Sequence, residues 1–160
     1  MLREQRKSLI QNEPKKEVVI NVLGKSFDVK IVRHGTNIDK IDNTLNKFLQ
    51  AKPWNNQSMY KEIYEKNSSR WDELNNDPYF KGKKVNSVSD ITKAIKEKVH
   101  TIDVGEHVCL LSGEWWIDPE HGWGINFWDG KYIPQGNKTP ELGYQNKFTY
   151  LTNAGDFRED

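Results

Sequence analysis

The spacing of hydrophobic residues predicts a β-hairpin near the start of the chain. Two runs rich in β-branched residues, 18–23 and 27–32, are joined by Gly24, Lys25 and Ser26. In the second run Phe27, Val29 and Ile31 alternate with polar residues, as expected for a strand with one solvated face.

The spacing then changes to that of amphipathic helices. A first helix is predicted to begin at residue 38, with Asn37 as its N-cap, and to end before Pro53. A second helix is predicted over residues 58–66. The residues of these two helices expected to face the core are Ile38, Ile41, Leu45, Phe48, Leu49, Met59, Tyr60, Ile63 and Tyr64.

An irregular segment and a short helix are expected before strands return. Residues 71–80 show no clear periodicity. The short helix is predicted to begin at a serine N-cap, Ser87 or Ser89, with its apolar face toward the core. Short strands then follow, over residues 99–104, 107–116, 123–128, 131–133 and 147–151.

This order predicts one α+β domain. Because strands and helices are segregated along the chain, we expect an antiparallel sheet, built from the N-terminal hairpin and a C-terminal meander, with helices packed on one face. Residues 1–16 lack periodicity and are expected to be a flexible or peripheral segment. The single domain then covers residues 17–160, a length that supports one core.

Composition restricts the classes of function. The formal net charge of +1 provides no general attraction to nucleic acid or to anionic membranes. The only cysteine, Cys109, lies in an apolar run and is expected to be buried in a strand. The chain has no apolar run of the ~20 residues needed to span a membrane and no signal-peptide pattern at Met1, so we expect a cytoplasmic location.

The most distinctive segment is residues 114–130, which holds four of the six tryptophans among acidic residues and glycines. It predicts a strand end, a turn carrying Asp118, Glu120 and His121, and a second strand closed by an Asp129-Gly130 hairpin turn. Aromatic residues provide large contact areas at low entropic cost, and a turn containing proline can present carboxylates rigidly. The segment is therefore a candidate recognition surface.

Three other interpretations of this segment remain open. In a metal-dependent hydrolase, Asp118, Glu120 and His121 would act with His100 or His107, although neighbouring residues on an extended chain tend to diverge. In a carbohydrate-binding module, exposed tryptophans would stack on sugars. In a purely structural turn, the Asp118 carboxylate would accept backbone N–H groups, while Gly122 and Gly124 adopt conformations that other residues resist.

The same residues carry a family resemblance. The motif formed by Trp116, Asp118, Glu120, His121, Gly122 and Gly124 resembles a bacterial family of small cytoplasmic proteins of unknown function, whose members have a tryptophan, one or two acids and Glu-His-Gly-x-Gly before a closing strand. The likeness covers about residues 18–137, and this chain differs by its Ile117 and Pro119. Such families are often encoded among toxin and immunity genes, which implies that the protein binds and neutralises a partner.

The sequence therefore leads us to expect a non-enzymatic binding protein, specifically an immunity protein that neutralises a cognate bacterial toxin. We expect no cofactor, no metal, and neither a nucleic acid nor a membrane as partner. The residues expected to bind the partner protein are Glu114, Trp116, Asp118, Glu120, His121, Trp123 and Asp129.

Overall fold

The structure is a computed structural model that describes residues 14–132. Most of the segment 1–16 and the strand predicted over 147–151 lie outside the described residues. The elements follow the order β1 (Glu17–Val22), β2 (Lys25–Arg33), α2 (Ile38–Ala51), η1 (Pro53–Asn55), α3 (Gln57–Lys66), α4 (Ser68–Asn75), η2 (Pro78–Phe80), α5 (Val88–Ile95), β3 (Lys98–Val104), β4 (Val108–Glu114), β5 (Trp123–Trp128) and β6 (Lys131–Tyr132).

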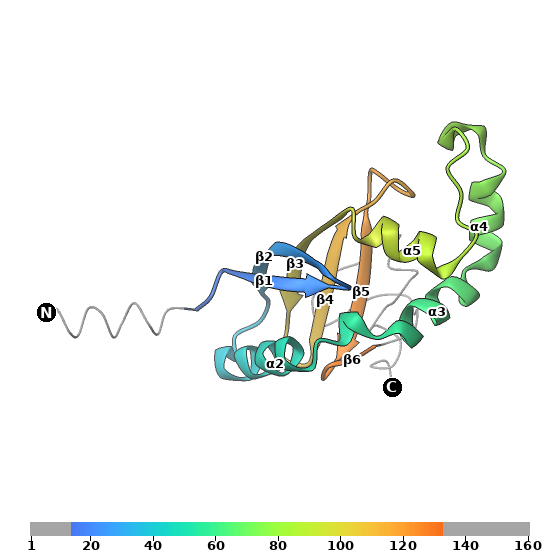
Figure 1. Ribbon diagram of the computed structural model, residues 1–160. Helices are drawn as coiled ribbons and strands as arrows, with labels where there is room; N and C mark the ends of the chain where they lie inside the picture. The colour runs from blue at the N-terminus through green and yellow to red at the C-terminus, as the bar shows by residue number, and fades with distance from the viewer. Residues whose placement is uncertain (1–13, 133–160) are drawn as a thin grey trace, which may run out of the picture.

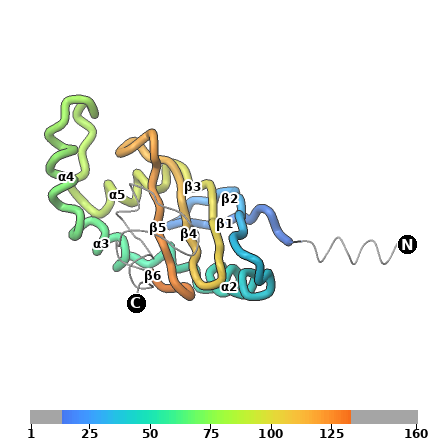
Figure 2. The backbone as a smooth tube through the Cα atoms, turned by 180° about the vertical axis from the view of Figure 1, so that it is seen from behind, coloured from blue at the N-terminus to red at the C-terminus, as the bar shows by residue number. Residues whose placement is uncertain are grey.

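The described residues form an α+β fold around one curled sheet (Figures 1 and 2). Its six strands lie in chain order, from β1 to β6. The prediction of a purely antiparallel sheet is wrong, because β2 and β3 pair in parallel while the other neighbours are antiparallel. The helical segment between β2 and β3 provides the long crossover that a parallel pair requires.

Both predicted hairpins are present, but the turn of the first is shorter and begins one residue earlier than predicted, because Lys25 and Ser26 belong to β2. Leu23 and Gly24 form the turn between β1 and β2, with φ angles of 49° and 94°. Asp129 and Gly130 form the turn between β5 and β6, with φ angles of 46° and 81°. Two consecutive positive φ angles give the turn a twist that matches its flanking strands.

Helix α2 begins and ends as its sequence predicts. The Asn37 side chain accepts a hydrogen bond from the backbone N–H of Lys40 at 3.2 Å, which satisfies one of the unpaired donors of the first turn. Lys52 adopts a left-handed conformation directly before Pro53 and ends the helix. Ile41, Leu45 and Phe48 are buried, whereas Ile38 at the first helical residue is 46% exposed and does not belong to the core.

The segment expected to be irregular, residues 71–80, is instead formed largely by the second half of helix α4 and by η2. Its Trp71 and Leu74 are buried, and the Trp71 indole N–H donates to the Tyr64 carbonyl at 3.0 Å. Tertiary packing therefore stabilises a helix in a sequence of low helical propensity. Ser87, and not Ser89, is the N-cap of α5, because the Ser87 hydroxyl oxygen accepts a hydrogen bond from the Asp90 N–H.

All four described helices contribute buried residues to one core with the inner face of the sheet. Aromatic rings form its centre, as the composition suggests: Phe48 lies 5.0 Å from Trp54 and 5.1 Å from Phe127 between ring centroids. Cys109 is buried in β4 as predicted. On the opposite face of β4, Val108 and Leu110 form a second, smaller buried cluster with Trp128.

Candidate functional site

The loop between β4 and β5, residues 115–122, is anchored to the core by two of its apolar side chains. Strand β4 ends at Glu114, two residues earlier than predicted. Trp115 and Ile117 are buried, while Trp116 between them is half-buried at the surface. The Trp116 ring lies edge-on to Phe80 at 5.7 Å between centroids, and its backbone N–H donates to the Glu97 carboxylate at 2.9 Å. Alternating burial thus fixes the first half of the loop.

Asp118 organises the second half of the loop. One oxygen of its carboxylate accepts the backbone N–H groups of Glu120 at 3.2 Å and His121 at 3.0 Å. The His121 ring nitrogen Nδ1 lies 3.3 Å from the same oxygen, and the Asp118 carbonyl accepts the Gly122 N–H at 2.8 Å. An aspartate that binds amides two and three residues ahead is a turn-forming residue. The structural interpretation is therefore correct for Asp118.

Gly122 closes the loop where no side chain fits. Its φ of +72° lies in the left-handed region, and a Cβ atom there would approach the Gly113 carbonyl oxygen to 2.2 Å. The loop backbone therefore packs directly on the end of β4. Gly124, for which a special conformation was also expected, lies within β5 and does not have a positive φ.

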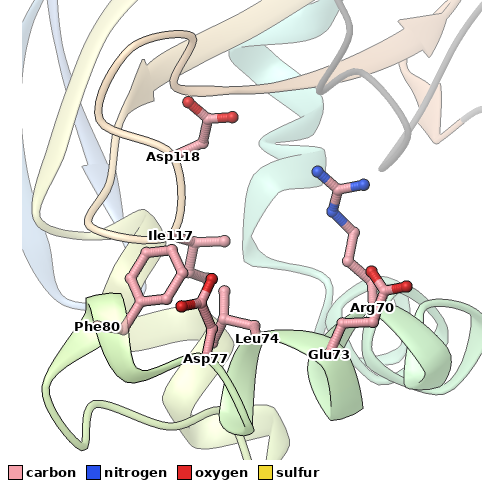
Figure 3. Close-up of a pocket in the computed structure, with 7 residues that line it drawn as sticks. All are labelled: Arg70, Glu73, Leu74, Asp77, Phe80, Ile117 and Asp118. Atoms are coloured by element: carbon pink, nitrogen blue, oxygen red, sulfur yellow. The ribbon is translucent and has the colours of Figure 1, made fainter.

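A cleft of about 280 Å³ separates this loop from helix α4 and turn η2 (Figure 3). We call it the acidic cleft and define it by Arg70, Glu73, Leu74, Asp77, Phe80, Ile117 and Asp118. Figure 3 shows Asp118 on the loop side of the cleft and Arg70, Glu73 and Asp77 on the helical side. Three carboxylates against one guanidinium give the lining a formal charge of −2. Leu74, Phe80 and Ile117 provide apolar surface beside these charges.

The combination of charge and apolar surface determines which groups this cleft can bind. A lysine or arginine side chain has an apolar stem and a cationic tip, and both parts find complementary surface here. Asp77 is already oriented, because its carboxylate accepts the Tyr79 N–H at 2.9 Å. Glu73 is exposed, so it can reach an incoming cation without a structural change.

A second recess of about 170 Å³ lies on another side of the loop, and we call it the histidine cleft. Its lining includes His100, Glu114, Glu120 and His121. Burial lowers the pKa of His100 below its ordinary value, and the nearby Glu114 carboxylate opposes this shift only partly. The ring nitrogen Nδ1 of His100 lies 2.7 Å from the Thr101 hydroxyl. The Glu114 carboxylate is 3.3 Å from the Lys98 ammonium group.

The structure brings five of the seven predicted partner-binding residues together at this loop: Glu114, Trp116, Asp118, Glu120 and His121. Trp123 is completely buried, so its indole supports the loop from the core and offers no contact area. Asp129 lies at the opposite end of β5, roughly 20 Å away at ~3.3 Å per residue. Asp129 is 3.6 Å from the Nδ1 atom of His107, so His107 also lies away from the loop.

Sequence reasoning missed the helical side of the acidic cleft. Arg70, Glu73 and Asp77 fall in or beside the segment expected to be irregular, and no motif marks them. A helix prediction over residues 68–75 would have placed Arg70 and Glu73 on one helix face, because residues three apart are neighbours on a helix surface. Their approach to the loop is a tertiary feature that no local pattern contains.

Two alternative interpretations lack support from this geometry. Within residues 14–132, no group of three or more His, Cys, Asp or Glu side chains is arranged to hold a metal ion. None of the six tryptophans, all of which lie in that range, is exposed, so none forms the open stacking surface that a carbohydrate-binding module needs.

Over the same described part of the chain, no helix combines the length and the apolar character needed to cross a membrane.

Comparisons with protein-family models, with curated proteins and with solved structures found no match for this chain. The assignment of function therefore depends on the site itself.

Proposed function

We propose that this protein binds a partner protein through the β4–β5 loop and the acidic cleft, and that it acts as an immunity protein that neutralises a cognate bacterial toxin. The observation that carries this proposal is the preorganised loop. It is fixed by buried Trp115 and Ile117 and by the hydrogen bonds of Asp118, yet it leaves Glu120 exposed. A surface that is already ordered loses little entropy on binding.

The charges of the site indicate the kind of partner surface that fits. The molecule as a whole is nearly neutral, so long-range attraction to a basic partner must come from a local patch. Glu73 and Asp77 supply that patch, together with the Asp118 carboxylate that also orders the loop, and Arg70 offsets one of these three charges. Glu120 lies on the adjoining part of the loop. We therefore propose that a lysine or arginine of the partner enters the acidic cleft.

Neutralisation rests on the family resemblance and is the less direct part of the proposal. A binding protein inhibits a toxin most simply by covering the toxin's active surface, and this requires a tight, stoichiometric complex. Hot-spot contacts near the centre of such an interface provide most of its affinity. The exposed carboxylate of Glu120 and the apolar edge of Trp116 are the residues that we expect at that centre.

The test is copurification with the tagged protein from its own host, followed by measurements on the purified partner. We expect one partner to bind the parent protein, and binding to fall at least tenfold for Glu73→Lys, which reverses a charge in the acidic cleft. The matched control is Glu65→Lys, at an exposed position of α3 outside both clefts. The partner expressed alone should arrest growth, and coexpression should restore it. Equal binding by both variants, or a harmless partner, would contradict the proposal.

A further inference from the structure

A second interaction surface lies at the free edge of the sheet, on strand β1. Val22 pairs with Lys25 across the two-residue turn, so the backbone groups of even-numbered residues of β1 face β2. The Lys16 carbonyl confirms this parity, because it accepts the Ile31 N–H at 2.8 Å. β1 is the first strand in the order of the sheet, so the odd-numbered residues of β1 direct their N–H and C=O groups away from the sheet.

One end of this edge is closed by the segment that follows α2. The Trp54 indole N–H donates to the Asn21 carbonyl at 2.9 Å, and the Asn55 side chain accepts the Leu23 N–H at 2.9 Å. Within residues 14–132, the outward N–H and C=O groups of Glu17 and Val19 have no hydrogen-bond partner. These groups form a short ladder that is ready to pair with another strand.

A cleft of about 490 Å³ runs beside this ladder, between β1 and the end of α2. We call it the edge cleft. Val18, Ile20, Leu49 and Trp54 supply its apolar lining, and Lys52 is the one charged residue among the described residues that line it. Val18 and Ile20 lie on the core-facing side of β1. Because cross-strand neighbours share a face, an added strand would direct every second side chain into this cleft.

The middle of this edge lacks the usual protection against pairing. Soluble proteins commonly guard edge strands with lysine, proline or a bulge. Pro14, Lys15, Lys16 and Glu17 protect the start of the edge, but residues 18–20 carry no charge and no proline. In addition, β1 pairs with β2 without a register shift, and Val19 is 64% exposed. A regular, uncharged stretch of edge strand beside an apolar cleft matches the features of a receptor edge for strand addition.

We infer that the β1 edge binds an extended strand of a partner protein, in antiparallel orientation, with aliphatic residues at alternate positions and an acidic residue near Lys52. Main-chain hydrogen bonds from Glu17 and Val19 would hold the strand, and the edge cleft would select its side chains. The acidic cleft and the edge cleft have no described lining residue in common, so this inference does not depend on the proposed function.

A second copy of this chain fits the edge less well. Two-fold pairing of β1 about Val19 would place Glu17 of the second copy opposite Asn21. The Asn21 carbonyl already accepts the Trp54 indole N–H, and Trp54 occupies that part of the edge. A strand from a different protein needs no such symmetry and can pair with the outward groups of Glu17 and Val19 alone.

The test uses a synthetic peptide of eight residues in which valine alternates with threonine, with one glutamate at each end. We expect sub-millimolar binding, with the largest amide chemical-shift changes at Glu17, Val19 and Asn21. Val19→Pro should weaken binding at least tenfold, because it removes an outward N–H group and leaves the hydrogen bonds to β2 in place. The matched control Val19→Thr should bind within twofold of the parent protein.

Two N-methylated peptides test the same idea without altering the protein. In the antiparallel arrangement, the valine side chains enter the edge cleft. The N–H groups of the valines then face away from β1, and the N–H groups of the threonines face β1. Methylation of the threonine nitrogens should abolish binding, and methylation of the valine nitrogens should change it less than threefold. Equal effects of the two patterns, or shift changes away from β1, would overturn the inference. Concentration-dependent shifts of the Glu17 and Val19 amides without peptide would also overturn it, in favour of a second copy.

Discussion

At the scale of single residues, the loop separates structural roles from recognition roles. Asp118 and Gly122 shape the backbone, through a carboxylate that accepts two amides and a glycine packed against the Gly113 carbonyl. Glu120 is exposed, and it enters these contacts through its backbone N–H rather than through its carboxylate. The sequence motif contains both kinds of residue, and only the structure distinguishes them.

Substitution of Gly122 by alanine should destabilise the fold strongly. A Cβ atom would lie 2.2 Å from the Gly113 carbonyl oxygen, in addition to the cost of the positive φ. We expect a loss of roughly 3 kcal/mol or more in the free energy of unfolding, measured by urea denaturation. Gly24→Ala is the control, because Gly24 also has a positive φ but a Cβ atom there would meet nothing within 4 Å. Its loss should be about 1 kcal/mol, and equal losses would show that the contact with Gly113 is unimportant.

The histidine cleft predicts a pH dependence of stability. Burial lowers the pKa of His100 in the folded protein, so the folded state binds a proton less readily than the unfolded state does. The stability associated with neutral His100 is therefore present above the unfolded pKa of about 6.5 and is lost as the pH falls toward the lowered value. We expect the difference in melting temperature between the parent protein and His100→Gln to shift against the parent between pH 7 and pH 5. A constant difference would contradict this assignment.

At the scale of elements, the sequence predicted the strands and helices whose own residues include a clear turn, an apolar stripe or a cap. The hairpin turns, the stripe on α2 and the cap of α5 follow from residues within a few positions of each other. Helix α4 could not be predicted, because its two buried residues are too few to define a face and its stability comes from tertiary packing, including the hydrogen bond from Trp71 to the Tyr64 carbonyl of α3. Half of the acidic cleft was missed for the same reason.

The cap of α5 allows a matched pair of substitutions. Ser87→Ala should destabilise the protein by about 1 kcal/mol, because the Asp90 N–H loses its acceptor. Ser89→Ala changes an exposed serine within the same helix and should have an effect within about 0.5 kcal/mol. Chemical denaturation of both variants provides the comparison, and a larger loss for Ser89→Ala would reverse the assignment of the cap.

At the scale of the whole molecule, the sequence predicted the fold class but not the direction of one strand pair. The alternation within β2 and β3 would be the same for parallel and antiparallel neighbours, so periodicity does not report pairing partners. The long helical crossover decides this pairing, through the way in which its helices pack against the sheet.

One shared core predicts one cooperative unfolding transition. The buried tryptophans Trp54, Trp71, Trp115 and Trp123 belong to the same cluster, although they come from distant parts of the chain. Thermal melting followed by tryptophan fluorescence and by far-ultraviolet circular dichroism should therefore give coincident curves. Two separated transitions would show that the N-terminal half and the meander form independent units.

The most direct test of the central claim is the affinity of the copurified partner for Glu120→Ala, measured by calorimetry beside the unfolding free energy of the same variant. If the loop is a recognition surface, binding should weaken by about 2 kcal/mol or more, while stability stays within about 1 kcal/mol of the parent protein. Glu65→Ala, an exposed carboxylate on α3, is the control and should change neither quantity. Unchanged partner binding by Glu120→Ala, or a loss of stability as large as the loss of binding, would contradict the claim.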